Sequence, residues 1–222
     1  MKVLGIDCAG SACAAGVVAE GRIVASRSEA MAQGQAEALV PMIDAVLTEA
    51  RLEVGALDLI AVTVGPGSFT GLRTGLATAR GLALASGKPL IGVTSFAAVA
   101  DAVSTEVGER PLVVALESKR AELYLQRFDR AGAGAPALLP ASLWPSVVPA
   151  EYFVIAGDGA ARFAAGLSGE GFLIAERYAH SNAVAAARLA PGLWKSGAAP
   201  PIPLYLRAPD VTLPPLRAKP AP

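Results

Sequence analysis

The sequence predicts an α/β protein with two related subdomains, each a mixed sheet flanked by helices. Short apolar runs alternate with segments whose apolar residues recur every three or four positions. The order strand, helix, strand over residues 57–93 implies a parallel crossover. Both halves place strands first and helices later. We expect the subdomains to span residues 1–105 and 106–207, with a proline-rich tail at 208–222.

Three strands joined by tight connections are expected to open the chain. Residues 2–7 and 12–19 are apolar runs, and Glu20-Gly21 is a turn signal before a further strand at 22–28. Such short connections favour an antiparallel meander.

Two long helices are expected next. Residues 35–52 carry apolar side chains at helical spacing, and Pro41 within them predicts either a kink or a helix that starts there. Residues 57–64 form a nearly continuous apolar run, which is typical of a strand buried on both faces. The second helix is expected over residues 68–86.

The remaining elements follow from the same patterns. After a strand at 90–93, Thr94 or Ser95 is placed to cap a short helix. In the second half we expect strands at 112–116, 121–128, 152–156 and 172–175, a loop at 130–140, and a helix at 181–195 capped by Ser181 or Asn182.

Composition restricts the function classes. Hydrophobic residues make up 53% of the chain and charged residues 17%, a globular and not a disordered composition. The formal net charge is zero, so no excess of basic residues indicates direct binding of a nucleic acid. No apolar stretch is long enough for a signal peptide or a membrane span. We expect a soluble, cytoplasmic protein in which Cys8 and Cys13 are buried and reduced.

A glycine-rich loop lies between a predicted strand and a predicted helix, and its key residues are Gly65, Gly67 and Ser68. Such a loop can turn backbone amides toward an anion at the helix N-terminus. No lysine follows the glycines as in a Walker A loop. The alternative is a tight turn that lets the helix lie close to the sheet.

Four segments resemble, in the right order, the bacterial TsaB family. They are VLGID at 3–7, GPGSFTGLR at 65–73, LESKRAELY at 116–124 and PLYLR at 203–207. The second matches the family pattern very closely and is highly specific. The first departs from the pattern at Cys8, where the family usually has Thr or Ser.

The resemblance implies the actin, sugar-kinase and Hsp70-like (ribonuclease H-like) fold. It also implies a role in threonylcarbamoylation of the tRNA adenosine next to the anticodon. In that role TsaD is the catalytic partner and TsaE is an ATPase. We therefore expect a TsaD-like protein as direct partner, a TsaE-like ATPase through the complex, and tRNA mainly through the complex.

In ATPases of this fold, acids at the positions of Asp7 and Glu117 hold metal-bound phosphate. Here Cys8 follows the first acid, and bulky residues (118–120) follow the second, where close phosphate approach requires glycine. We therefore expect a degenerate site with no catalytic residue, no metal and no cofactor. Its candidate remnants are Asp7, Gly65, Gly67, Ser68 and Glu117.

The helix at 68–86 carries Gly71, Gly75 and Ala79 four residues apart, while Arg73 and Arg80 share another face. Spacing alone leaves two alternatives. This face is a helix-to-helix interface, or the stripe of small residues packs against the chain's own sheet and the arginines are exposed to solvent. The resemblance favours the interface, because the first two long helices form the dimer and TsaD interfaces in this family. The expected interface residues are Leu39, Ile43, Leu47, Phe69, Arg73, Leu76 and Arg80.

The single histidine, His180, excludes the paired-histidine metal site of TsaD-like proteins. We interpret it as a surface or capping residue. The leading hypothesis is therefore a non-catalytic partner subunit, a monomer or a homodimer when alone, without membrane contact. The alternative is a nucleotide-binding ATPase or phosphotransferase of the same fold, and a peptidase is the weakest hypothesis.

Overall fold

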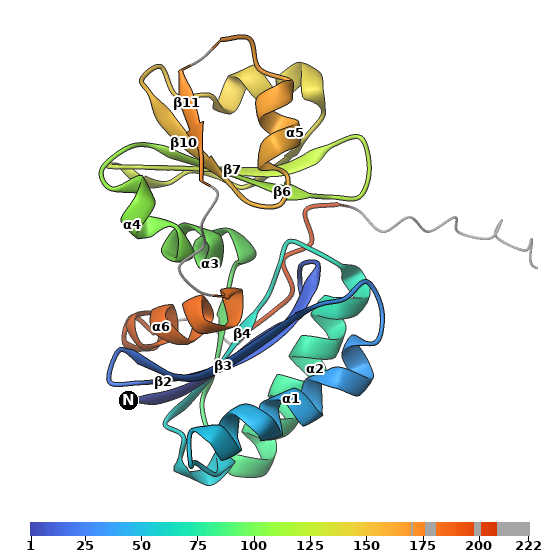
Figure 1. The fold of residues 1–222 in the computed structure, drawn as a ribbon, viewed down its shortest axis with the longest axis vertical. Coiled ribbons are helices and arrows are strands. Elements are labelled where there is room, and N and C mark those ends of the chain that lie inside the picture. Colours follow the sequence, from blue (N-terminus) through green and yellow to red (C-terminus); the bar gives the residue numbers. More distant parts are fainter. Residues whose placement is uncertain (170, 176–180, 198–200, 208–222) are drawn as a thin grey trace, which may run out of the picture.

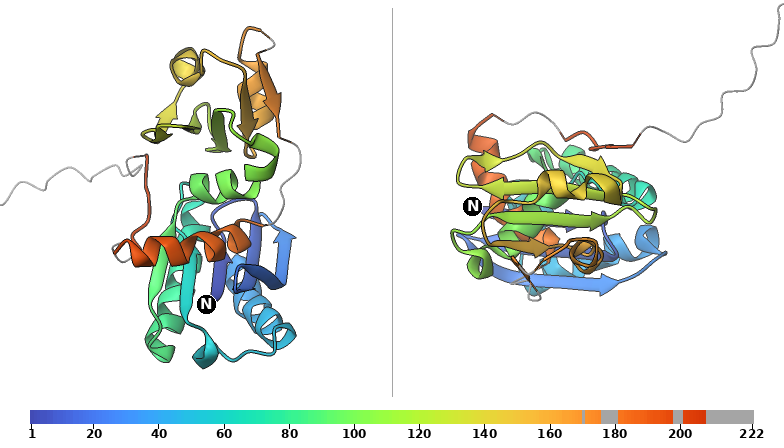
Figure 2. Two further views of the ribbon diagram at one scale, coloured as in Figure 1. Left: turned by 90° about the vertical axis from the view of Figure 1, so that its left-hand side faces the viewer. Right: turned by 90° about the horizontal axis from the view of Figure 1, so that it is seen from above.

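The computed structural model describes residues 1–169, 171–175, 181–197 and 201–207. Two lobes, each built on a mixed sheet, lie one above the other in Figure 1. Helices α3 and α6 occupy the space between the sheets, and the same layering is visible from the side in Figure 2.

The first sheet has the strand order β3-β2-β1-β4-β5. Strand β1 pairs antiparallel with β2 and parallel with β4, and β2 pairs antiparallel with β3, which confirms the predicted meander. Strand β4 pairs parallel with β5, which confirms the predicted crossover. The strands are β1 (Lys2–Asp7), β2 (Ala12–Ala19), β3 (Arg22–Ala30), β4 (Leu59–Thr63) and β5 (Leu90–Val93).

The second sheet has the order β11-β10-β6-β7-β8, with β9 also paired to β7. Strand β6 pairs antiparallel with β7 and parallel with β10, which repeats the relations of β1. The prediction of two related subdomains is therefore confirmed. The strands are β6 (Leu112–Glu117), β7 (Leu123–Asp129), β8 (Gly132–Ala133), β9 (Ala137–Leu139), β10 (Phe153–Ala156) and β11 (Phe172–Ile174).

The predicted loop at 130–140 is wrong in part, because it contains β8 and β9. Their residues are small or lie next to glycine and proline, so they carry little strand signal. They nevertheless pair with β7, where Phe128 lies opposite Ala133 and Leu125 opposite Ala137. Pairing to an existing strand thus determines the structure of this segment.

Helices α1 (Gln35–Glu49) and α2 (Phe69–Ser86) cover one face of the first sheet. Helix α1 begins at Gln35, so the alternative that it starts at Pro41 is wrong. Helix α2 begins where predicted, since the Ser68 hydroxyl accepts a hydrogen bond of 3.3 Å from the Gly71 amide.

Helix α6 (Asn182–Lys195) covers the opposite face of the first sheet, although it belongs to the second half of the chain. The division expected at residue 105 therefore does not describe how this helix packs. Gly5 of β1 allows the close approach, because a Cβ there would lie 1.8 Å from the Ala183 carbonyl oxygen. Conversely, α3 (Ser95–Ala102) follows the first sheet yet packs on the second.

Shorter helices complete the second lobe and the connections. Trp144 and Phe163 cover the outer face of the second sheet with their rings 5.5 Å apart. Along the described parts of the chain, no helix has both the length and the apolar character required to cross a membrane. The short helices are η1 (Val54–Ala56), α4 (Ser104–Val107), η2 (Ala141–Val147) and α5 (Ala160–Ala165).

Candidate functional site: the cleft between the lobes

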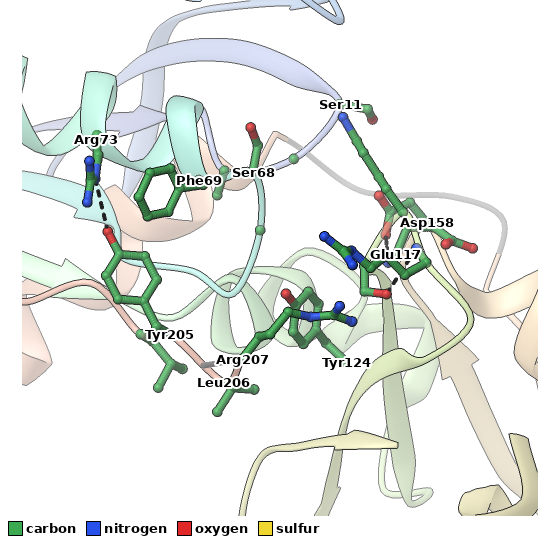
Figure 3. A pocket seen from close by; sticks show the side chains of 17 residues that line it. Ser11, Ser68, Phe69, Arg73, Glu117, Tyr124, Asp158, Tyr205, Leu206 and Arg207 are labelled. Atoms are coloured by element: carbon green, nitrogen blue, oxygen red, sulfur yellow. Dashed lines mark hydrogen bonds between the residues drawn. The ribbon is translucent and has the colours of Figure 1, made fainter. Parts of the chain in front are cut away.

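A cleft opens between the lobes where β1 and β6 end. One pocket of about 680 Å³ lies between the start of α2, the β6–β7 hairpin and residues 204–207 (Figure 3). A second pocket of about 690 Å³ adjoins it and reaches Asp7 and the N-termini of α3 and α6. Of the predicted phosphate residues, Gly67 and Glu117 line both pockets, Ser68 lines the first and Asp7 the second, whereas Gly65 lines neither; Asp158 also lines both.

Asp7 lies at the end of β1 and is only 3% exposed. Its Oδ1 accepts a hydrogen bond of 2.5 Å from the Thr63 hydroxyl and one of 2.9 Å from the Ala9 amide. Burial raises the pKa of Asp7, while the hydrogen bonds from Thr63, Ala9 and Asn182 act in the opposite direction. The carboxyl group is therefore already satisfied by the protein around it.

The glycine loop is packed against the chain that leaves β1. A Cβ at Gly67 would lie 2.1 Å from the Ala9 carbonyl oxygen, and one at Gly71 would lie 1.9 Å from that of Cys8. The Ser68 amide donates to the Ala9 carbonyl at 2.7 Å. Gly65 has a φ of 101°, which favours glycine. These contacts favour the tight turn over the phosphate loop.

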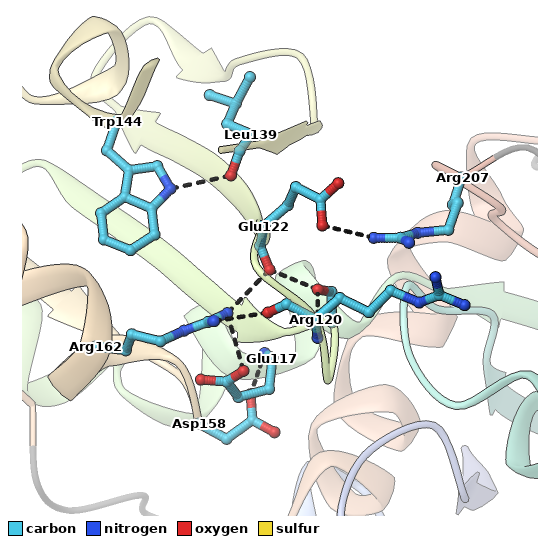
Figure 4. Close-up of polar contacts among 9 residues, drawn as sticks. Glu117, Arg120, Glu122, Leu139, Trp144, Asp158, Arg162 and Arg207 are labelled. Carbon is cyan, nitrogen blue, oxygen red and sulfur yellow. Dashed lines mark hydrogen bonds and ion pairs between the residues drawn. The ribbon is translucent and has the colours of Figure 1, made fainter. Parts of the chain in front are cut away.

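Glu117, the acid of the second half, is engaged by a guanidinium. A carboxylate oxygen of Glu117 lies 3.0 Å from Arg162, and the Glu117 amide donates to Asp158 at 2.9 Å (Figure 4). Arg162 also donates to the carbonyl oxygens of Arg120 and Glu122, at 2.7 and 2.9 Å. Arg162 thus holds the turn of the β6–β7 hairpin in place.

Asp158 and Arg162 were not among the predicted site residues. Asp158 stands in a Gly-Asp-Gly turn, and a Cβ at Gly157 would lie 2.1 Å from the Ala115 carbonyl oxygen. This repeats the approach of Gly67 to Ala9 in the first lobe. The sequence signal was the pair of glycines after a buried strand, which recurs in both halves.

The rim of the cleft carries an aromatic and cationic cluster formed by Phe69, Arg73 and Tyr205. The Arg73 guanidinium carbon lies 3.7 Å from the centroid of the Phe69 ring. Arg73 Nε donates to the Tyr205 hydroxyl at 3.5 Å, and the two aromatic rings lie 5.6 Å apart (Figure 3). Phe69 is 54% exposed and Tyr205 45% exposed, so the cluster faces outward.

The expected interface residues divide into two groups. Phe69, Arg73 and Arg80 are exposed on α2, and Arg80 donates to the Pro201 carbonyl at 2.8 Å. The other four face the sheet inside the chain's own core and present no surface to a partner: Leu39, Ile43, Leu47 and Leu76. Helical spacing identifies an apolar face but does not say which partner covers it.

The stripe of small residues on α2 also faces inward. Gly71, Gly75 and Ala79 are buried, and a Cβ at Gly75 would lie 3.7 Å from Val62 of β4. Of the two alternatives left by spacing, the stripe against the chain's own sheet therefore describes the structure. The outward surface of α1 and α2 instead carries exposed apolar side chains at Val40 and Leu84.

The two cysteines lie beside each other under the cleft, with their sulfur atoms 3.5 Å apart. Both are free and buried, and burial raises the pKa of each thiol, which disfavours the reactive thiolate. Within the described ranges, no three His, Cys, Asp or Glu side chains are grouped to hold a metal ion. His180, interpreted from the sequence as a surface or capping residue, lies outside those ranges.

Sequence comparison finds relatives along most of the chain. The family model TsaD, tRNA N6-adenosine threonylcarbamoyltransferase, matches residues 23–140. An uncharacterized protein of Mycobacterium tuberculosis (strain ATCC 25618 / H37Rv) is 35% identical over 94% of this chain and 92% of that protein. The tRNA threonylcarbamoyladenosine biosynthesis protein TsaB of Escherichia coli (strain K12) is 30% identical over 59% of this chain and 56% of that protein.

Solved structures extend the likeness to the fold. YeaZ from Pseudomonas aeruginosa has a TM-score of 0.78 and 27% identity, covering 92% of this chain and 99% of that chain. The activator of the 2-hydroxyisocaproyl-CoA dehydratase from Clostridium difficile, with bound ADPNP, has a TM-score of 0.56 and 10% identity, covering 89% and 97%. The second likeness concerns the fold alone. The expected actin-like fold is confirmed.

Proposed function

Because the chain belongs to the TsaD/YeaZ (TsaB) family, we propose that it is a non-catalytic partner subunit in tRNA threonylcarbamoylation. Its direct partner is a TsaD-like protein, which carries the activity. A TsaE-like ATPase and the tRNA join through that complex, in the cytoplasm. The chain's contribution is a surface that binds the partner and holds it in an active arrangement.

The proposal that the chain is non-catalytic rests on the partners of its two cleft acids, Asp7 and Glu117. Glu117 forms an ion pair with Arg162, and Asp7 is buried with Thr63 and Ala9 bound to its Oδ1. An acid that supports phosphate transfer must direct its oxygens to a metal ion or to substrate. Here internal donors already occupy both carboxyl groups.

The outward surface of α1 and α2 carries the partner-binding part. It combines exposed apolar side chains with a basic group stacked on an aromatic ring, the composition typical of interface hot spots. Val40 is 58% exposed, Phe69 54% and Leu84 87%. Arg73 and Arg80 add charge to the same helix. We therefore keep Phe69, Arg73 and Arg80 from the predicted interface and add Val40 and Leu84.

Co-purification with a TsaD-like protein tests the proposal. The triple variant Val40→Glu, Phe69→Ser, Leu84→Glu changes exposed side chains only, so the chain should stay folded. We expect it to lose binding, and to lose the threonylcarbamoyl transfer that the wild-type chain supports in the mixture.

Leu143→Glu is the matched control. Leu143 is also half exposed, at 50%, but lies in η2 of the second lobe. This variant should bind and support transfer like the wild type. Retained binding by the triple variant would show that the surface is misplaced. Hydrolysis of magnesium-ATP by the isolated chain, abolished by Glu117→Gln, would instead favour the ATPase alternative.

A further inference from the structure

Residues 201–207 run along α2 and across the cleft from the first lobe to the second, and we call them the strap. On the first lobe, the Pro201 carbonyl accepts from Arg80 at 2.8 Å, and the Leu204 amide donates to the Val64 carbonyl at 2.7 Å. Each of these contacts uses a main-chain group of the strap. The strap is therefore attached to the first lobe through its backbone, and the Tyr205 side chain adds contacts with Phe69 and Arg73.

The far end of the strap is attached to the second lobe. Leu206 packs against the core cluster between α3 and the second sheet, of which Leu116 and Tyr124 are members. A guanidinium nitrogen of Arg207 lies 2.9 Å from a carboxylate oxygen of Glu122 in the β6–β7 region (Figure 4). One apolar contact and one ion pair thus hold this end.

The strap lies at one part of the cleft, and helices α3 and α6 lie at another. Strap residues 204–207 line the first pocket, which contains no residue of α3 or α6. The second pocket is lined by Ser95 of α3 and Asn182 of α6. The lobes are therefore joined through α3 and α6 at one part of the cleft and through the strap at another.

We propose that the strap is a latch between the lobes, which fixes the width of the first pocket. With both ends attached, the second lobe cannot turn away from the first about α3 and α6. Among the described residues, release of Leu206 and Arg207 leaves the connection through α3 and α6 and lets the pocket widen. Tyr205 lies within the strap and touches Phe69 of α2, so a molecule covering this pair would also act on the latch.

A distance measurement on the full chain without any partner tests the latch, so its result is independent of the proposed function. Spin labels are placed at Leu84→Cys in the first lobe and Leu143→Cys in the second, both exposed. Cys8 and Cys13 are buried and should not react with the labelling reagent. The double substitution Leu206→Ala, Arg207→Ala should give a longer and broader distance distribution than the parent.

Arg130→Ala is the matched control, because it breaks an ion pair of 2.7 Å with Glu109 that does not involve the strap. It should leave the distribution unchanged. If the double variant does not fold, Glu122→Gln removes only the charge partner of Arg207 and should broaden the distribution. Exchange of the two charges, Glu122→Arg with Arg207→Glu, should narrow it again. Distributions identical to the parent in the folded latch variants would overturn the proposal.

Discussion

A guanidinium nitrogen of Arg162 lies 3.0 Å from a carboxylate oxygen of Glu117. The same side chain donates to two main-chain carbonyl oxygens of the β6–β7 hairpin, those of Arg120 and Glu122. An ion pair this exposed contributes little, about 0–1 kcal/mol, whereas two hydrogen bonds from a charged donor contribute more. Arg162 therefore stabilises the fold mainly through its hydrogen bonds to these two carbonyl oxygens.

Truncation of Arg162 separates these contributions. Arg162→Ala should lower the free energy of unfolding by about 1–3 kcal/mol, because the exposed carbonyl of Arg120 and the partly buried carbonyl of Glu122 lose a charged donor. Glu117→Gln removes only the ion pair and should cost less than about 1 kcal/mol. Urea denaturation of the purified chain measures both. If both variants lost the same free energy of unfolding, the ion pair would account for the whole effect of Arg162 and the hydrogen bonds for none of it.

The glycines of α2 should respond to alanine in opposite directions. Gly71→Ala places a Cβ 1.9 Å from the Cys8 carbonyl oxygen, so the helix must shift and stability should fall by roughly 1–3 kcal/mol. At Gly81, no atom lies within 4 Å of the added Cβ. Gly81→Ala should therefore raise stability by about 0.5–1 kcal/mol through helix propensity. Thermal and urea unfolding report the sign, and a stabilised Gly71→Ala chain would refute the close contact.

Asp7 should make the wild-type chain less stable as the pH rises. Burial raises the pKa of its carboxyl group above the ordinary value of 3.8, so the folded chain holds the proton more tightly than the unfolded chain. The resulting stability is fully present below pH 3.8 and is lost as the pH rises through the folded-state pKa.

Asp7→Asn removes this penalty and keeps an oxygen to accept from Thr63 and Ala9, while Asn182 can rotate its amide to match. The melting temperature of the variant minus that of the wild type should therefore increase between pH 4 and pH 8. A difference that stays constant over this range would mean that the acid does not titrate as burial predicts.

The strap should weaken in acid. The pKa of Glu122 lies below its ordinary value of 4.5, through a hydrogen bond from its own backbone, the hydrogen bond from Arg207, and the positive charges of Arg207 and Arg120. The pair is thus intact above pH 4.5 and is lost as the pH falls through the lowered pKa. The spin-label distance should differ between wild type and Glu122→Gln at pH 7, and the two should converge once the pH falls below the lowered pKa of Glu122. If the spin-label distances of wild type and variant differed by the same amount at every pH, the latch would not depend on the charge of Glu122.

Local patterns predicted most of the elements, because the physical causes lie within a few residues. The caps at Thr94 and Ser181 accept from amides three residues on, as expected from hydroxyl side chains before apolar helices. Strand β4 is buried at every position, as its continuous apolar run predicted.

Long-range packing was not predictable in the same way. Nothing near residues 182–195 says that this helix covers the first sheet, and nothing near Tyr205 says that it meets Arg73, far away in the sequence. The candidate site shows the same limit: the sequence identified Asp7 and Glu117, but not the donors that occupy them. A pattern that marks an apolar face, as at Leu39, does not say whether it meets the chain's own sheet or another protein.

The contact between Gly5 and Ala183 has a consequence for synthesis of the protein on the ribosome. The strand that carries Gly5 is synthesised long before the helix that covers its inner face. Until then Val3, Leu59 and Ile91 lack the apolar cover that α6 gives them on that side. Growing chains that stop before residue 182 should therefore be recognised by chaperones that bind exposed hydrophobic surface, and chains that extend past α6 should be released.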